Sequence, residues 1–386
     1  MLFYGKDLPV VYAIAVFQAL MFALTVLFMA GLYRRTTPVA AMLGFAAMTA
    51  GSYYLYGLVS PNGSFRAPGY ALVDVLPLLQ GASLGGMSLL SFMAALIPAG
   101  LALSLLNRRG YGLHTTWGLP VLLLSGFGVW QMAQPQGETV RVALLSDNRQ
   151  VARVLRDPAS DPEVVGAFAK QIEKVAVQKP VYIVIPEKIV LPGRAFQGLS
   201  DRMGAGIVAG VDAPQGGGRL NLATLTQPKS APLTYSKQRM VPGLEAEYVP
   251  GNAPLITGRI GIAICKDMDF PEVLRPYGQK DVKLMLVPAW DFVADARLHS
   301  RMAIVRGVEN GFAVARSASQ GLMTLSDAHG RIMAEQPAVN GPALLMDDLP
   351  TGRGHTLYSR IGDVFAQAML ALWLGLLALL VWRHRK

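Results

Sequence analysis

Long uncharged runs occupy much of the first third of the chain and its C-terminal end. They cover 8–33, 39–58, 75–107, 114–137 and 364–382. A helix needs about 20 apolar residues to cross the hydrocarbon core of a bilayer. The run at 114–137, which Gly and Pro interrupt, barely supplies them. The pattern therefore predicts a membrane domain at 1–137 with about four transmembrane helices, and a further membrane helix with a basic tail at 361–386.

The pattern changes between these runs, where short apolar stretches alternate with polar ones. This spacing is typical of alternating strands and helices in a soluble α/β domain. Three glycines at 214–219 indicate a hairpin turn; a phosphate loop would need a following Lys-Ser or Lys-Thr. We predict strands at 141–145, 182–185, 206–211, 220–225, 260–264, 284–287, 312–317 and 322–326, and helices at 161–177 and 296–309, in a domain spanning 138–360.

The composition agrees with a membrane protein and argues against a nucleic-acid binder. The chain is 52% hydrophobic and 16% charged, with a net charge of +10, and its mean hydropathy is +0.36. A nucleic-acid binder would concentrate this charge in one basic face or arm with interleaved aromatic residues. Much of the charge instead forms short clusters beside the apolar runs, which is how membrane topology is encoded.

The basic clusters predict one orientation in the membrane. They are Arg34-Arg35, Arg108-Arg109 and the tail at 383–386, which the positive-inside rule assigns to the cytoplasm. The 138–363 region then lies outside, in the periplasm if the membrane is a bacterial inner membrane. A single cysteine suits that oxidising compartment, because it has no partner in the chain for a disulfide.

That cysteine, Cys265, ends the predicted strand at 260–264, where polar residues follow at once. A nucleophile at the end of a buried strand is held rigidly and can face a cleft. Position alone leaves a second interpretation open, because a lone cysteine is often a small buried hydrophobe.

The surrounding motif favours the nucleophile. The stretch Gly-Ile-Ala-Ile-Cys-Lys-Asp-Met-Asp-Phe-Pro-Glu at 261–272 resembles the nucleophile elbow of the nitrilase (carbon–nitrogen hydrolase) superfamily. Four further segments resemble motifs of that superfamily and occur in the same order. They are Val-Tyr-Ile-Val-Ile-Pro-Glu at 181–187, Tyr-Ser-Lys-Gln-Arg-Met-Val-Pro-Gly-Leu-Glu at 235–245, Arg-Gly-Val-Glu-Asn-Gly-Phe at 306–312 and Ser-Asp-Ala-His-Gly-Arg-Ile at 326–332.

The resemblance implies an αββα sandwich and a Glu–Lys–Cys triad. Glu187 would be the general base, Lys237 would stabilise a tetrahedral oxyanion, and Cys265 would attack as a thiolate. Glu245 and Asp267 are supporting candidates that would align Lys237 or the substrate. Taken singly, Glu187 could be an ordinary strand-end carboxylate and Lys237 a surface lysine.

The flanking apolar helices narrow the resemblance to the apolipoprotein N-acyltransferase family. The segments 76–92 and 357–363 resemble membrane-proximal motifs of that family, although its members have more membrane spans than the five predicted here. The resemblance implies a phospholipid acyl donor, an amine acceptor such as a lipoprotein N-terminus, and a Cys thioester intermediate. A membrane-tethered amidase or nitrilase, or a non-catalytic membrane assembly factor that keeps the fold, are the alternatives.

Several other residues carry weaker signals. Lys266 stands where the family often has tyrosine; it could lower the pKa of the neighbouring thiol or pair with Asp267 or Asp269 at a water-filled edge. Trp290 and Phe292 could line an acyl cleft or simply pack, and Arg301 and Arg306 suit structural ion pairs. No cofactor or metal is predicted, because the histidines lack the spacing of a metal site; they are His114, His299, His329, His355 and His384.

Overall fold

The computed structural model describes residues 8–106, 111–193 and 196–384. It divides into two compact units, one comprising Met1–Gln134 with Arg360–Lys386 and the other comprising Pro135–Ser359. These limits lie close to the domain boundaries expected at 138 and 360. Arg108, Arg109 and the last two residues of the basic tail, on which part of the predicted topology depends, lie outside the described residues.

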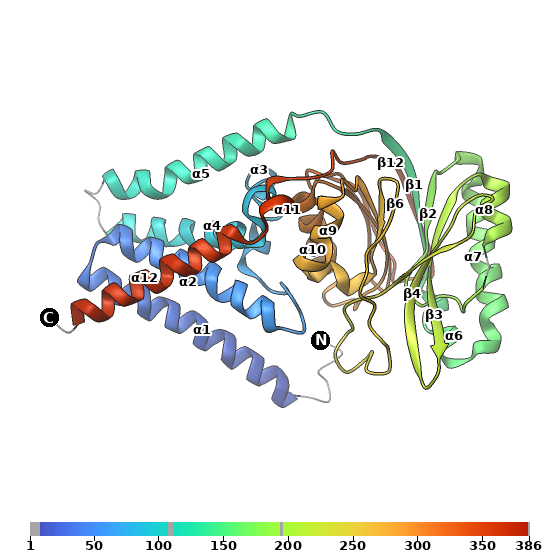
Figure 1. Ribbon diagram of the computed structural model, residues 1–386, viewed down its shortest axis with the longest axis horizontal. Helices are drawn as coiled ribbons and strands as arrows, with labels where there is room; N and C mark the ends of the chain where they lie inside the picture. The colour runs from blue at the N-terminus through green and yellow to red at the C-terminus, as the bar shows by residue number, and fades with distance from the viewer. Residues whose placement is uncertain (1–7, 107–110, 194–195, 385–386) are drawn as a thin grey trace. The chain divides into compact units, whose positions relative to one another are not determined.

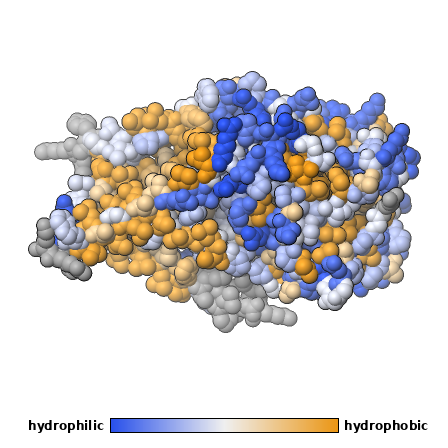
Figure 2. Space-filling view, in the orientation of Figure 1, coloured by the Kyte–Doolittle hydropathy of each residue, from blue (hydrophilic) through white to orange (hydrophobic). Residues whose placement is uncertain are grey.

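The first unit is helical (Figure 1). Its helices are α1 (Leu8–Arg35), α2 (Pro38–Val59), η2 (Pro68–Leu72), α3 (Leu76–Leu79), α4 (Ala82–Leu106), α5 (Tyr111–Met132) and α12 (Val364–His384). Three segments among the described residues are long and apolar enough to cross a membrane, namely Ala15–Arg35, Ala82–Leu106 and Val364–Arg383. Figure 2 shows hydrophobic residues gathered over the helices of this unit. The chain is therefore that of a membrane protein.

Two predicted spans differ in character from these three. α2 and α5 each have 22 residues, which corresponds to about 33 Å of helix, and whether they cross the bilayer stays a prediction. The run at 75–107 is divided between the short α3 and the long α4, and α4 itself is broken at Gly85 and Gly86. Gly86 has φ 64° and ψ −163°, a combination that only glycine adopts readily.

The second unit contains two mixed six-stranded sheets. The first has the order β12-β1-β2-β3-β4-β5, and the second has the order β11-β10-β9-β8-β7-β6. In each sheet the three strands at the centre run parallel, β1-β2-β3 and β7-β8-β9. The strands are β1 (Thr139–Asp147), β2 (Tyr182–Val184), β3 (Gly206–Gln215), β4 (Gly218–Thr226), β5 (Leu233–Ser236), β6 (Leu255–Thr257), β7 (Ile260–Ile262), β8 (Leu284–Trp290), β9 (Ala313–Ser319), β10 (Leu322–Ser326), β11 (Ile332–Pro337) and β12 (Pro342–Pro350).

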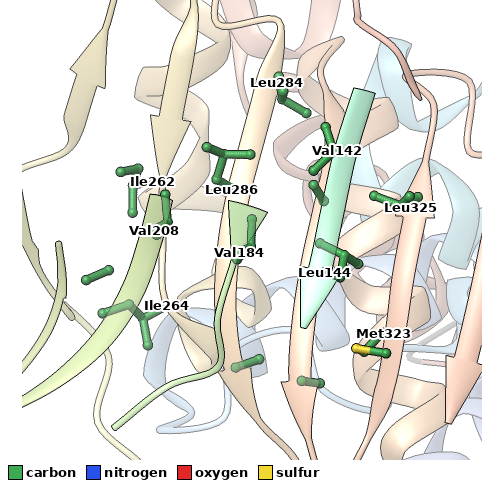
Figure 3. Packing of buried hydrophobic residues seen from close by; sticks show 14 of the residues in the cluster. Val142, Leu144, Val184, Val208, Ile262, Ile264, Leu284, Leu286, Met323 and Leu325 are labelled. Atoms are coloured by element: carbon green, nitrogen blue, oxygen red, sulfur yellow. The ribbon is translucent and has the colours of Figure 1, made fainter. Parts of the chain in front are cut away.

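Alternating side chains build the layers of this unit. Val142 and Leu144 of β1 point into the core between the sheets, where they pack with residues such as Leu286 of β8 (Figure 3). The intervening Ala143 and Leu145 belong to a separate core beneath the outer helices, because successive side chains of a strand face opposite sides.

Helices cover the outer face of each sheet. α7 (Asp161–Val175) and α8 (Gln197–Met203) pack on the first sheet, and α9 (Pro271–Gln279) and α10 (Ala296–Asn310) pack on the second. The predicted αββα sandwich is confirmed, together with the class of membrane helices plus an α/β domain. The remaining short helices are η3 (Asn148–Gln150), α6 (Arg153–Arg156), η4 (Pro158–Ser160), η5 (Ala176–Gln178), η6 (Cys265–Asp269) and α11 (Leu357–Ile361).

Two local predictions need correction. The strand expected at 260–264 ends at Ile262, because the chain leaves the sheet there and enters η6 at Cys265. The hairpin between β3 and β4 is tighter than expected, since its turn consists of Gly216 and Gly217 at φ 41° and 95°. Both values lie in the left-handed region that glycine tolerates at little cost, and both strands are correspondingly longer than predicted.

Candidate active site

Cys265 lies on a tight turn between β7 and α9. It is the first residue of η6 and has φ 43°, a left-handed value that is uncommon for a residue with a side chain. Its Sγ donates a hydrogen bond to the backbone oxygen of Trp290, at the end of β8, over 3.4 Å. Only 8% of the residue is exposed. The thiol is therefore held at the ends of two neighbouring parallel strands.

Glu187 and Lys237 meet in the same interior. Glu187 follows β2 and Lys237 follows β5, and both side chains are buried. Lys237 Nζ donates to Glu187 Oε1 at 2.8 Å. Both charges act electrostatically on the Cys265 thiol, so the structure brings the three residues of the expected triad into one cluster. Buried charges are tolerated when they are paired in this way.

Glu245 completes the pairing of the lysine. Its two carboxylate oxygens accept from Lys237 Nζ at 3.1 and 2.9 Å. Burial opposes ionisation of Glu245, but the charges of Lys237 and Lys188 lower its pKa to about 2. Asn221 of β4 joins the two glutamates, since its Nδ2 donates to Glu187 Oε1 at 2.5 Å and to Glu245 Oε1 at 2.8 Å. The sequence had not indicated Asn221.

Asp267 fastens the elbow to the segment that carries the lysine. Its Oδ1 accepts from the backbone N–H groups of Gln238 and Arg239 at 3.0 and 2.8 Å. Its Oδ2 accepts from the Tyr235 hydroxyl at 2.8 Å and from the backbone N–H of Ile264 at 3.0 Å. Burial raises the pKa of Asp267 to about 6, although Lys237 and these donors oppose the rise. These contacts join the elbow to the backbone of the two residues that follow Lys237, and a role of Asp267 in aligning Lys237 stays a prediction.

The thiol is electrostatically different from the expectation. Burial, together with the charges of Glu187 and Asp291, raises the pKa of Cys265 well above its ordinary value, and Lys237 and Arg316 only oppose the rise. The interaction of Lys266 with the thiolate is favourable, so the prediction that Lys266 lowers the thiol pKa stays a prediction, while the net pKa of the thiol is raised. A thiol in this setting is neutral at rest and needs a base to become a nucleophile.

Lys266 is buried and faces acidic groups. Its Nζ lies 3.8 Å from Asp269 Oδ2, which agrees with the predicted pairing of Lys266 with an aspartate. The water-filled edge expected for this pair is wrong, because the side chain is buried. Burial lowers the pKa of Lys266. His299 of α10 lies 3.7 Å from Asp269 and 3.6 Å from Asp295. Asp269 therefore links η6 to the start of α10.

A buried ion pair beside the elbow was missed by the sequence analysis. Asp291 follows β8, and Arg316 lies on β9. The guanidinium donates from Nη1 to Asp291 Oδ2 at 2.7 Å and from Nη2 to Oδ1 at 2.5 Å. Both side chains are almost fully buried. The signal available in the sequence was a single arginine inside the apolar run at 312–317.

Replacing Arg316 by Met is expected to destabilise the second unit by about 3–5 kcal/mol, the usual cost of leaving one partner of a buried ion pair uncompensated. Thermal unfolding of the detergent-solubilised protein measures this. The double variant Arg316→Met with Asp291→Leu should recover much of the loss, because it removes both charges. Arg141→Met breaks an exposed pair with Asp348 and should change stability far less. Equal losses for Arg316→Met and Arg141→Met would contradict this account.

The other residues singled out in the sequence are two aromatic residues and two arginines. Trp290 Nε1 donates to Gln320 Oε1 at 3.1 Å, and an acyl cleft at Trp290 and Phe292 stays a prediction. Arg301 and Arg306 form the expected ion pairs, with Glu335 and Glu309. Within the part of the chain that the structure describes, no group of three His, Cys, Asp or Glu residues could hold a metal ion.

Comparisons with known proteins show what this chain is similar to. Residues 191–356 match the carbon-nitrogen hydrolase family. The matched residues resemble a carbon–nitrogen hydrolase domain, and apolar helices precede and follow them in the sequence. An apolipoprotein N-acyltransferase of Geobacter metallireducens is 26% identical, covering 95% of this chain and 80% of the relative. One of Chromobacterium violaceum is 24% identical, covering 89% of this chain and 73% of the relative.

Among solved structures, the chain is similar to a mutant of the amidase from Nesterenkonia sp. AN1, which bears a covalently added acetamide moiety on its active-site cysteine. The sequence identity is 22% and the TM-score is 0.49, over 61% of this chain and 98% of the amidase.

Proposed function

We propose that this protein is a membrane-bound N-acyltransferase that moves an acyl chain from a phospholipid to an amine through a thioester on Cys265. One observation carries the proposal: the Cys265 thiol is buried, and the charges of the paired Glu187 and Lys237 act on it, in a chain with membrane-type helices. The name of the curated relatives supports the acyl-transfer chemistry and suggests a lipoprotein N-terminus as the acceptor.

In the first half-reaction, Glu187 accepts the thiol proton and the Cys265 thiolate attacks an ester carbonyl of the phospholipid. The resulting oxyanion is stabilised by the Lys237 ammonium. The carbon–oxygen bond then breaks, the leaving lysophospholipid oxygen takes the proton from Glu187, and the acyl group remains on sulfur. During this step Glu245 holds the Lys237 ammonium in place, and Asp267 keeps the elbow bound to the segment that follows Lys237.

In the second half-reaction, an amine attacks the thioester carbonyl while Glu187 accepts a proton from the nitrogen. The carbon–sulfur bond breaks, the thiolate recovers its proton, and an amide is released. The test incubates the full-length protein in phospholipid vesicles with a diacylglyceryl-cysteine peptide. We expect lysophospholipid and N-acylated peptide in equal amounts. Free fatty acid without acylated peptide would instead identify a hydrolase in which water resolves the thioester.

We further propose that the protein is a multi-pass protein of a bacterial inner membrane with its second unit in the periplasm. The support is the position of Arg34-Arg35 and Arg383 beside apolar helices. A reporter that is active only outside the cytoplasm should be active when fused after Gly137 and silent when fused after Lys386. The reverse pattern would overturn the orientation.

A further inference from the structure

A second buried lysine lies beside the candidate triad. Lys188 directly follows Glu187 and has φ 54°, a left-handed value. Its Nζ forms an ion pair with Glu245 Oε1, and lies 4.3 Å from the centre of the Tyr248 ring and 5.9 Å from that of Trp290. The side chain is only 8% exposed. A left-handed backbone and a buried ammonium both cost free energy, so a substantial interaction must hold Lys188 here.

Glu245 does not need Lys188 to satisfy its hydrogen bonds. Its carboxylate already accepts from Lys237, from Asn221 and from the backbone N–H of Val241. These donors occupy both oxygens. Lys188 therefore contributes mainly a positive charge. This charge lies near the Glu245 carboxylate and the rings of Tyr248 and Trp290, whose faces attract cations.

The charge balance of the cluster formed by Glu187, Glu245, Lys237 and Lys188 indicates what this addition does. Glu187 and Glu245 are two buried carboxylates that share one ammonium, that of Lys237. Lys188 brings the cluster to two cations and two carboxylates. Without it, one negative charge would be in excess in a low-dielectric interior, where electrostatic effects are strong. That charge would oppose formation of both a thiolate and an oxyanion.

We propose that Lys188 is a positioning residue of the site, which binds Glu245 and balances its charge so that the Lys237 ammonium remains available to the thiolate and to the substrate oxyanion. The oxyanion part rests on the acyl-transfer function proposed above, whereas the thiolate part does not. Besides Lys237, the charged groups that act on the thiol are Glu187, Asp291 and Arg316. Lys266 also interacts with the thiol.

The test follows alkylation of Cys265 by iodoacetamide as a function of pH. The full-length protein in detergent has only this one cysteine, so the modification is read directly by mass spectrometry. Lys188→Met shortens the side chain by one heavy atom and removes the charge. We expect its alkylation at neutral pH to be at least about tenfold slower, which corresponds to a rise of one unit in the thiol pKa, with the difference narrowing as the pH increases. Lys188→Arg should stay near the wild-type profile.

The control is Lys179→Met. Lys179 also has a left-handed backbone, at φ 50°, but it is exposed and lies outside the cluster. It should leave the alkylation profile unchanged, and circular dichroism should show all variants folded. Superimposable profiles for wild type and Lys188→Met would overturn the proposal, as would equal slowing in Lys188→Arg and Lys188→Met, which would point to shape and not to charge.

This experiment is independent of the acyl substrate. The alkylation profile could shift in Lys188→Met while the wild-type protein forms no acyl adduct with phospholipid. That result would support the electrostatic role of Lys188 and reject the acyl-transfer function. An acyl adduct with an unshifted profile would do the opposite.

Discussion

Replacing Cys265 by Ala is expected to abolish both acyl-enzyme formation and amine acylation. The chain has a single cysteine, so no other thiol can form the thioester. Alanine also keeps the left-handed backbone at φ 43° with a side chain no larger than the thiol, so the elbow should persist. Cys265→Ser should be nearly inactive, because a serine hydroxyl is far harder to deprotonate than a thiol and the site was not built to activate one.

The measurement is release of lysophospholipid from labelled vesicles, with formation of N-acylated peptide followed in parallel. Thermal unfolding of both variants in detergent controls for folding. Turnover in Cys265→Ala at even a tenth of the wild-type rate would show that the nucleophile lies elsewhere.

Replacing Glu187 by Gln should reduce turnover by at least about 100-fold, the usual scale for loss of a general acid–base group. The resting thiol is neutral because burial raises its pKa, so its proton must be taken away, and the amide of Gln cannot accept it. Lys237→Met should cause a loss of similar size through the missing oxyanion stabilisation. It should also destabilise the domain, since Glu187 and Glu245 lose their shared partner.

Glu272→Gln is the matched control. Glu272 is an exposed carboxylate of α9 that pairs with Arg239, and its loss should leave turnover within about twofold of wild type, since surface ion pairs contribute little. Wild-type turnover in Glu187→Gln would remove the proposed base and with it the triad.

The fold was predictable where side-chain periodicity is strong. Strand β1 is buried on both faces, so residues 142–145 read in the sequence as a continuous apolar run. Helix α7 was predicted from the regular spacing of Val164, Phe168 and Ile172. Strand ends were less predictable, because β7 ends where the elbow turns away from the sheet and local propensity does not encode that turn.

The candidate site was predictable only where ordered motifs mark it. Glu187 and Cys265 each follow a short apolar segment, Lys237 lies in the motif at 235–245, and the order of these motifs indicated that the three residues meet. No motif in the sequence marks the other residues of the site, which are Asn221, Lys188, Asp291 and Arg316. Their partners come from distant strands, so their role depends on how the sheets bring the chain together. The raised thiol pKa was missed for a related reason, since burial outweighs the neighbouring cations.

The thioester on Cys265 can be detected directly. The full-length protein is incubated with a diacyl phospholipid in the absence of any amine acceptor, digested, and examined by mass spectrometry for a fatty acyl group on the peptide that contains Cys265. We expect a long-chain acyl adduct on Cys265 that neutral hydroxylamine removes and that Cys265→Ala does not form. An unmodified Cys265 peptide, in a folded protein that still releases lysophospholipid, would contradict it.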